Sequence, residues 1–116
     1  MNEILDRVTI ITRREKEEEL RRALKEIGID GMTVTNVEGC GVQRAEVRYY
    51  RGVKSEVRLL PKVMFEVVVS ESIVDKIIAK AKEVLHTGKI GDGKIFVEEE
   101  SRIVRIRTGE EGSQAL

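Results

Sequence analysis

A short segment rich in glycine and lysine has the composition of a phosphate-binding loop. Residues 87–94 read Thr-Gly-Lys-Ile-Gly-Asp-Gly-Lys, with three glycines and two lysines in eight positions. Because glycine has no Cβ, successive backbone N–H groups in such a loop can turn inward and surround an anion. The spacing matches neither a P-loop nor a dinucleotide fingerprint. A plain helix-to-strand turn with solvated lysines therefore explains these eight residues about equally well.

A second basic pattern follows the loop and favours the phosphate interpretation. Residues 102–107 read Arg-Ile-Val-Arg-Ile-Arg. This alternation predicts a short strand over residues 103–107, in which Arg105 and Arg107 share one face about 7 Å apart. Two guanidinium groups at that separation can hold a polyphosphate. The loop and the arginine pair together predict a nucleotide site.

Length and composition favour a single domain, 1–116, with its own core. The 21 basic and 21 acidic side chains cancel and aromatic residues make up only 3%, which argues against nucleic acid as a partner. Cys40 and His86 are the only residues of their types, so no disulfide or Cys/His metal cluster forms within one chain. Cys40 reads as a small, partly buried apolar residue. With no apolar run of membrane-spanning length, we expect a cytoplasmic protein without membrane insertion.

The hydrophobic patterns predict an alternation of strands and two helices. One helix follows Thr12, which has the spacing of a capping box with Glu15, and ends at Gly28. The other starts at Ser72 and ends at the glycine-rich loop. The order βαββαβ is that of an α+β, ferredoxin-like fold, which leaves one sheet face free for self-association. The main strands are expected at residues 4–11, 32–37, 59–69 and 95–98.

The segment between the second and third strands is unusually long. Residues 39–58 show no sustained helical or strand period, and connections of this length are usually functional or disordered. From Val42 to Arg58 the segment carries three more positive than negative charges. We expect a mobile basic arm that docks onto a partner, and a solvated hairpin is the alternative.

Six short segments, spread over nearly the whole chain, form a recognisable set. They are residues 31–35 (Gly-Met-Thr-Val-Thr), 39–43 (Gly-x-Gly-x-Gln), 50–52 (Tyr-Arg-Gly), 60–63 (Leu-Pro-Lys-Val), 87–96 (the loop through Phe96) and 105–110 (Arg-Ile-Arg-Thr-Gly-Glu). In this register the chain resembles the P-II nitrogen regulatory signal-transduction proteins. The resemblance implies a homotrimer with a nucleotide site in each cleft between subunits, where ATP and ADP compete.

Carried over by position, the resemblance assigns the nucleotide contacts. The adenine would meet Thr33 and Val68, and the ribose would lie near Gly41. Val42 would lie beside the phosphates, where relatives frequently have arginine. The phosphates themselves would be held by Gly91, Asp92, Gly93, Lys94, Arg105 and Arg107, in agreement with the reading of the loop above.

The resemblance also implies that 2-oxoglutarate binds beside ATP through a shared Mg²⁺ ion. The amide oxygen of Gln43 would be the metal ligand, and it is the hard donor that Mg²⁺ prefers. Lys62 would pair with a carboxylate of 2-oxoglutarate, and Arg44 and Gly91 would complete that site. Ala45 stands where relatives usually have glycine.

In the same family the arm corresponds to the T-loop, at about residues 41–58, followed by a phosphate-binding loop at about 87–94 and a C-terminal segment at about 102–116. A ligand that contacts the base of the T-loop shifts the populations of the loop conformers. The free energy of that shift is no larger than the difference in the ligand's affinity for the conformers. Tyr50, Arg51 and Gly52 would contact the partner, in the first place an ammonium transporter. Ser55 occupies the position of the uridylylated tyrosine, so that modification should be absent.

The predicted function is a non-enzymatic sensor of ATP or ADP and 2-oxoglutarate that regulates nitrogen assimilation. Other targets, such as a nitrogenase regulator's partner or a biosynthetic enzyme, are possible in the same family. A slow ATP-hydrolysing enzyme on this fold is the alternative, although the sequence offers no nucleophile–base pair. An RNA-binding module is disfavoured, because the paired aromatic residues of its RNP motif are missing.

Overall fold

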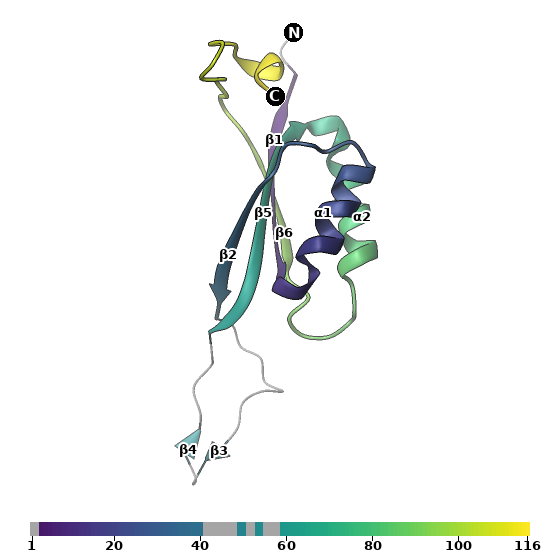
Figure 1. Ribbon diagram of the computed structural model, residues 1–116, viewed down its shortest axis with the longest axis vertical. Helices are drawn as coiled ribbons and strands as arrows, with labels where there is room; N and C mark the ends of the chain where they lie inside the picture. Colours follow the sequence, from purple (N-terminus) through teal and green to yellow (C-terminus); the bar gives the residue numbers. More distant parts are fainter. Residues whose placement is uncertain (1–2, 41–48, 51–52, 55–58) are drawn as a thin grey trace.

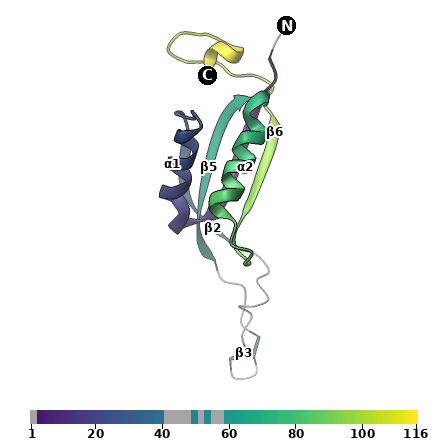
Figure 2. The ribbon, with the colours of Figure 1, turned by 90° about the vertical axis from the view of Figure 1, so that its right-hand side faces the viewer.

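The computed structural model describes residues 3–40, 49–50, 53–54 and 59–116. Four long strands form one antiparallel sheet in the order β2-β5-β1-β6, and two helices lie side by side on one of its faces (Figures 1 and 2). The predicted α+β ferredoxin-like fold is confirmed. The strands are β1 (Leu5–Arg13), β2 (Thr33–Gly39), β3 (Tyr49–Tyr50), β4 (Val53–Lys54), β5 (Leu60–Ser70) and β6 (Lys94–Glu99). The helices are α1 (Glu17–Glu26) and α2 (Val74–Leu85), with the short 3₁₀ turns η1 (Arg14–Lys16), η3 (Glu71–Ile73) and η4 (Gly112–Ala115).

Strand β1 lies at the centre of the sheet and pairs on both sides. Its register with β5 runs from Leu5 opposite Ser70 to Arg13 opposite Lys62. Its pairing with β6 ends where Ile11 lies opposite Lys94. Because directly opposite residues share a face of the sheet, this register decides which side chains point toward the helices.

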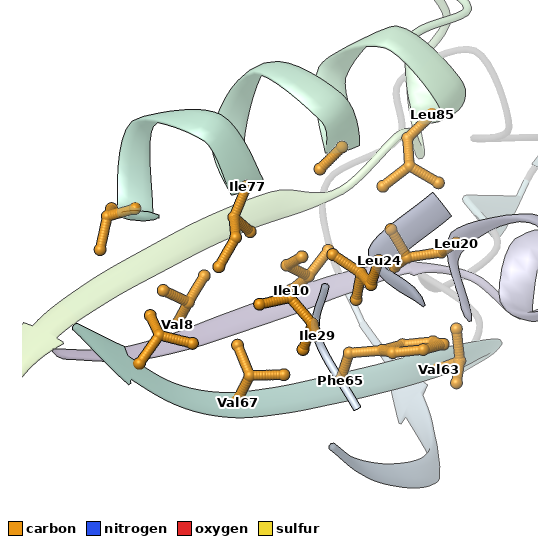
Figure 3. Close-up of a cluster of buried hydrophobic side chains, with 13 residues drawn as sticks. Val8, Ile10, Leu20, Leu24, Ile29, Val63, Phe65, Val67, Ile77 and Leu85 are labelled. Atoms are coloured by element: carbon orange, nitrogen blue, oxygen red, sulfur yellow. The ribbon is translucent and has the colours of Figure 1, made fainter. Parts of the chain in front are cut away.

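One hydrophobic core lies between the sheet and the helices. Figure 3 shows Leu20 and Leu24 of α1 and Ile77 of α2 packed near Ile10 and Phe65 of the sheet. Each of these five side chains is at most 1% exposed. Full burial of such a side chain contributes about 1.5–3 kcal/mol. The core therefore fixes the helices on the sheet and, with them, the positions of the strand ends.

The other face of the sheet carries no helix in the described part of the chain (Figure 1). By register this face bears the side chains of Ile11, Met64, Val68 and Phe96. The first three are half-buried, and Phe96 is 49% exposed. We call this the open face.

Arg7 forms a charged cluster on the open face. Its Nε donates to Glu100 Oε2 at 2.9 Å and its Nη1 donates to Glu66 Oε2 at 3.1 Å. These charge-assisted hydrogen bonds, that with Glu100 first, raise the pKa of the Arg7 guanidinium above its ordinary value. The open face thus combines apolar side chains with one fixed ionic group.

Both predicted helix caps are wrong. Strand β1 runs on through Arg13, and Thr12 is a buried strand residue, 1% exposed. Before α2, the side chain of Ser70 rather than Ser72 accepts a hydrogen bond, from the Ser72 backbone N–H at 3.3 Å. In both places a strand extends to complete its pairing with a neighbour, and a 3₁₀ turn then leads into the helix. Neither α1 nor α2, nor any other described helix, has the length and hydropathy needed to cross a membrane.

The predicted strand over residues 103–107 is also wrong. Val104 makes a single antiparallel bridge with Glu111, and the chain turns back on itself between them. The Arg105 N–H donates to the Glu110 carbonyl at 2.8 Å, and the Gly109 N–H donates to the Arg105 carbonyl at 2.7 Å. This segment therefore pairs with its own continuation, which the positive φ of Gly109 (+75°) permits.

The long segment before β5 contains a two-stranded pairing. Tyr49 lies opposite Lys54 and Tyr50 opposite Val53, in β3 and β4. Cys40, expected to be partly buried, is exposed at the end of β2. The predictions for eight further positions lie outside the described residues: Gly41, Val42, Gln43, Arg44, Ala45, Arg51, Gly52 and Ser55.

Candidate functional site

The glycine-rich loop joins α2 to β6 and folds against the end of β1 (Figure 1). Gly88, Gly91 and Gly93 have φ values of +81°, +105° and +103°. These lie in the left-handed region, which L side chains rarely adopt. The loop therefore depends on its glycines, as the sequence predicted.

Gly93 also makes the closest approach of the loop to the sheet. A Cβ atom on Gly93 would lie 1.8 Å from the Ile11 carbonyl oxygen and 2.9 Å from the Thr12 Cα. Around Gly88, by contrast, the nearest atom to an added Cβ would be His86 Nε2 at 3.9 Å. Gly93 is required by both conformation and space, and Gly88 by conformation alone.

Asp92 organises the loop from inside. Its carboxylate accepts hydrogen bonds from the Thr87 hydroxyl, from the Thr87 N–H at 2.8 Å and from the Gly88 N–H at 3.0 Å. These bonds, the Thr87 hydroxyl first, hold the pKa of the Asp92 carboxyl well below its usual range. Because the folded pKa is lowered, this anchor is present at neutral pH and is lost only when acid protonates the carboxylate. The predicted contact of Asp92 with a nucleotide stays a prediction.

Two cations lie at the same end of the sheet. Arg13 and Lys62 are directly opposite each other in the register of β1 and β5. Like charges in that position repel. Here Arg13 Nη2 donates to the Ile90 carbonyl at 2.8 Å, and Lys62 Nζ donates to the Gly91 carbonyl at 3.1 Å. The loop carbonyls offset part of the repulsion, and a bound anion would offset more of it.

Sequence reasoning missed Arg13 and Thr12. The Thr12 hydroxyl donates to the Asp92 carbonyl at 2.8 Å, and Arg13 Nη2 lies 3.4 Å from Asp92 Oδ1. The sequence placed Thr12 at a helix cap because Glu15 follows at capping-box spacing. The available signal was that Arg13 directly follows a β-branched strand, but only the pairing with β5 places it beside Lys62.

The residues predicted to meet the adenine lie on the open face. Thr33 in β2 is opposite Glu66, and Val68 in β5 is opposite Arg7. Thr33 is exposed and Val68 is half-buried. Both side chains are therefore accessible from the side that bears no helix.

Arg105 and Arg107 are not near the loop of the same chain. They lie in the C-terminal segment, beyond the opposite end of β6 from the loop (Figure 1). Strand β6 has six residues, and at about 3.3 Å per residue it separates the two ends by roughly 17 Å. Arg105 Nη1 lies 3.5 Å from Glu110 Oε1, and Arg105 Nη2 donates to the Leu116 carbonyl. The expected arrangement of the two arginines on one strand face is wrong.

Two cavities of the described chain do not combine the predicted nucleotide residues. One of about 250 Å³ lies behind the loop on the helix side, where the predicted residues Asp92, Gly93 and Lys94 line it together with apolar side chains such as Leu85. One of about 700 Å³ lies between the start of β1 and the C-terminal segment, where Glu3, Glu99 and Glu111 disfavour phosphate. Neither cavity is lined by Thr33 or Val68.

Comparison with known proteins assigns the family. The family model described as "Nitrogen regulatory protein P-II" matches residues 5–110. The chain belongs to the P-II family. It is 48% identical over 110 residues to the "Nitrogen regulatory PII-like protein" of Bacillus subtilis, covering 95% of each chain. It is 47% identical over 109 residues to the "Nitrogen regulatory protein GlnK" of Escherichia coli, covering 94% of this chain and 97% of that one.

Solved structures of P-II proteins share the fold. The GlnK–ATP complex of B. subtilis aligns with a TM-score of 0.82 and 42% identity, covering 100% of this chain and 99% of that one. The P-II protein of Arabidopsis thaliana bound to citrate aligns with a TM-score of 0.79 and 35% identity, covering 98% and 94%. The resemblance identified in the sequence is therefore confirmed for family and fold.

The two glycines of the loop provide a matched test of its packing. Gly88→Ala should lower the free energy of unfolding by about 1–2 kcal/mol, the usual cost of a left-handed L residue. Gly93→Ala should cost about 1–3 kcal/mol more, because its Cβ collides with backbone of β1. Urea unfolding at a fixed protein concentration measures both variants. Equal losses would contradict the close approach of Gly93 to β1.

Proposed function

We propose that this P-II protein is a trimeric switch that binds ATP or ADP between subunits, senses 2-oxoglutarate and regulates nitrogen-assimilation targets. The observation that carries the proposal is the cationic pair of Arg13 and Lys62 beside a glycine loop at the end of β1. An anionic ligand is the natural partner for two like charges held in direct opposition. That a 42% identical GlnK was solved with ATP supports a nucleotide at the glycine loop beside this pair, with the pair itself left for a second anion.

The separation of the loop from Arg105 and Arg107 supports assembly between copies. One chain presents the loop at one end of β6 and the arginines beyond the other. A neighbouring copy related by rotation would bring its arginines to the loop of the first. A closed ring satisfies every such contact, and the apolar part of the open face would be covered at the same time.

For the effector, we propose that Lys62 and Arg13 receive carboxylate oxygens of 2-oxoglutarate. A 35% identical P-II protein was solved with citrate, a related carboxylate. Among the described residues no three His, Cys, Asp or Glu side chains gather to hold a metal ion. The proposed Mg²⁺ ion would take its oxygen ligands from the nucleotide phosphates, from 2-oxoglutarate and from Gln43.

The output is proposed to be a contact with a partner protein in the cytoplasm rather than a reaction. Arg51, with Tyr50 and Gly52, is the proposed contact, and an ammonium transporter is the proposed first target. A target in nitrogenase regulation or in biosynthesis would use the same arm. Weak ATP hydrolysis is compatible with this role, because regulation depends on occupancy rather than on turnover.

Mixed trimers test whether each site is shared between copies. Lys94→Ala should weaken the phosphate contacts of the loop, and Arg107→Ala should remove a phosphate contact of the C-terminal segment. A homotrimer of either variant should therefore bind ATP weakly. A trimer containing both variants has one interface in which an intact loop faces an intact arginine. Calorimetry after mixing and refolding should recover about one tight site per mixed trimer. Recovery of none would place the loop and arginines of a site on one chain.

The order of ligand binding tests the effector site. Titrations of 2-oxoglutarate should show binding only when Mg-ATP is present, and binding with ADP alone would contradict the shared metal ion. Lys62→Ala should remove 2-oxoglutarate binding and leave ATP affinity within about threefold, because one charged hydrogen bond to the effector is lost. Lys80→Ala is the control, because Lys80 Nζ pairs with Glu26 Oε2 of α1 at 3.3 Å and not with the loop. Equal loss of both ligands would show that Lys62 holds the nucleotide.

Substitution at the arm tests the partner. Arg51→Ala should weaken capture by a membrane preparation containing an ammonium transporter by at least tenfold, because truncating an interface arginine often costs more than about 1.4 kcal/mol. Nucleotide affinity should be unchanged. Arg22→Ala on the outer face of α1, where the side chain is 74% exposed, is the matched control. Unchanged capture of the Arg51 variant would move the contact elsewhere.

A further inference from the structure

Three consecutive residues at the end of β1 hold the glycine-rich loop. The Ile11 carbonyl lies against Gly93, Thr12 Oγ1 donates to the Asp92 carbonyl at 2.8 Å, and Arg13 Nη2 donates to the Ile90 carbonyl at 2.8 Å. Arg13 is half-buried and remains accessible to a ligand. Thr12 differs from it, since its side chain is 1% exposed and, by its register with Val63, points to the helix side of the sheet.

The hydrogen bond from Thr12 reaches the residue on which the rest of the loop depends. Asp92 is tied to β1 through its backbone carbonyl and to the start of the loop through its carboxylate, which accepts from Thr87 and Gly88. One buried hydroxyl therefore connects the sheet to both arms of the loop. The described chain has no other side-chain hydrogen bond to the Asp92 carbonyl.

A glycine-rich loop has a particular need for such a connection. Glycine loses more conformational entropy than other residues when its backbone is fixed. If the loop were free before binding, a phosphate ligand would have to order it and would bind more weakly. Holding the loop in advance removes that cost from the binding step.

We propose that Thr12 is a positioning residue, whose hydroxyl sets the phosphate affinity of the loop without touching the ligand. The inference rests on the proposed nucleotide site. It adds a specific consequence for ligand choice. Because Thr12 acts through the phosphate loop, it should affect ATP and ADP but not adenosine, whose base and sugar would meet other elements.

A matched pair of substitutions tests the role of the hydroxyl. Thr12→Val keeps the size and β-branching and removes the donor, whereas Thr12→Ser keeps the donor. Calorimetric titration should show Mg-ATP binding to Thr12→Val about three- to tenfold more weakly than to the wild type, the usual net effect of one hydrogen bond. Thr12→Ser should bind Mg-ATP within about twofold of the wild type. Adenosine affinity should be the same for all three proteins.

Three results would overturn the inference: unchanged ATP affinity of Thr12→Val, equal loss of ATP and adenosine, or a Thr12→Ser variant as weak as Thr12→Val. Hydrogen exchange of the Thr87 and Gly88 amides in the ligand-free protein gives a second readout. Exchange should be faster in Thr12→Val and unchanged in Thr12→Ser, and equal rates would overturn the positioning role. If Thr12→Val does not fold, Thr12→Ala removes the same donor and takes its place in both measurements.

The two proposals fail in different ways. A wild-type protein that binds neither ATP nor ADP would end the proposed function, while the exchange rates would still decide whether Thr12 positions the loop. A wild-type protein that binds ATP, together with a Thr12→Val variant of equal affinity or equal exchange, would end this inference alone.

Discussion

The central strand β1 pairs along both edges, and the placement of the candidate site depends on this pairing. Its register with β6 brings the glycine-rich loop to the residues that follow Ile11. Its register with β5 sets Arg13 opposite Lys62. The core of α1 and α2 holds the sheet on one side only, so the strand ends and the open face remain available for ligands and other copies. The site is therefore a property of strand register more than of any one motif.

The loop and the two cations stabilise each other. Arg13 and Lys62 repel across the strands, and each finds a carbonyl of the loop. The loop, in turn, contains glycines in conformations that offer little intrinsic preference for one shape. The mutually repelling side chains of Arg13 and Lys62 therefore lie beside the flexible backbone of the glycine-rich loop, and each stabilises the other. Asp92 completes the arrangement, because its carboxylate accepts hydrogen bonds from the Thr87 and Gly88 N–H groups, which offset part of its repulsion of an incoming phosphate.

Much of this was readable from the sequence. Strand and helix order followed from hydrophobic periodicity, the dependence of residues 87–94 on glycine from turn chemistry, and the family from six short sequence segments. In each of two errors, a local sequence pattern was overridden by backbone pairing that the pattern does not encode. Thr12 has the spacing of a cap, yet pairing with β5 extends β1 past it. Residues 103–107 alternate like a strand, yet they pair with their own continuation. Arg13 directly follows a β-branched strand, but only the pairing of β1 with β5 places it beside Lys62.

The ionic group of Arg7, Glu66 and Glu100 has a consequence for the newly made chain. A sheet face on which Met64, Val68 and Phe96 are accessible favours irreversible aggregation of the monomer. The charges of Arg7, Glu66 and Glu100 lie among those side chains. Nonspecific stacking of another sheet on this face would bury them without new partners, which carries a desolvation penalty. Only a partner that leaves the ionic group satisfied escapes that penalty. By this reasoning the Arg7 cluster disfavours nonspecific stacking of the open face.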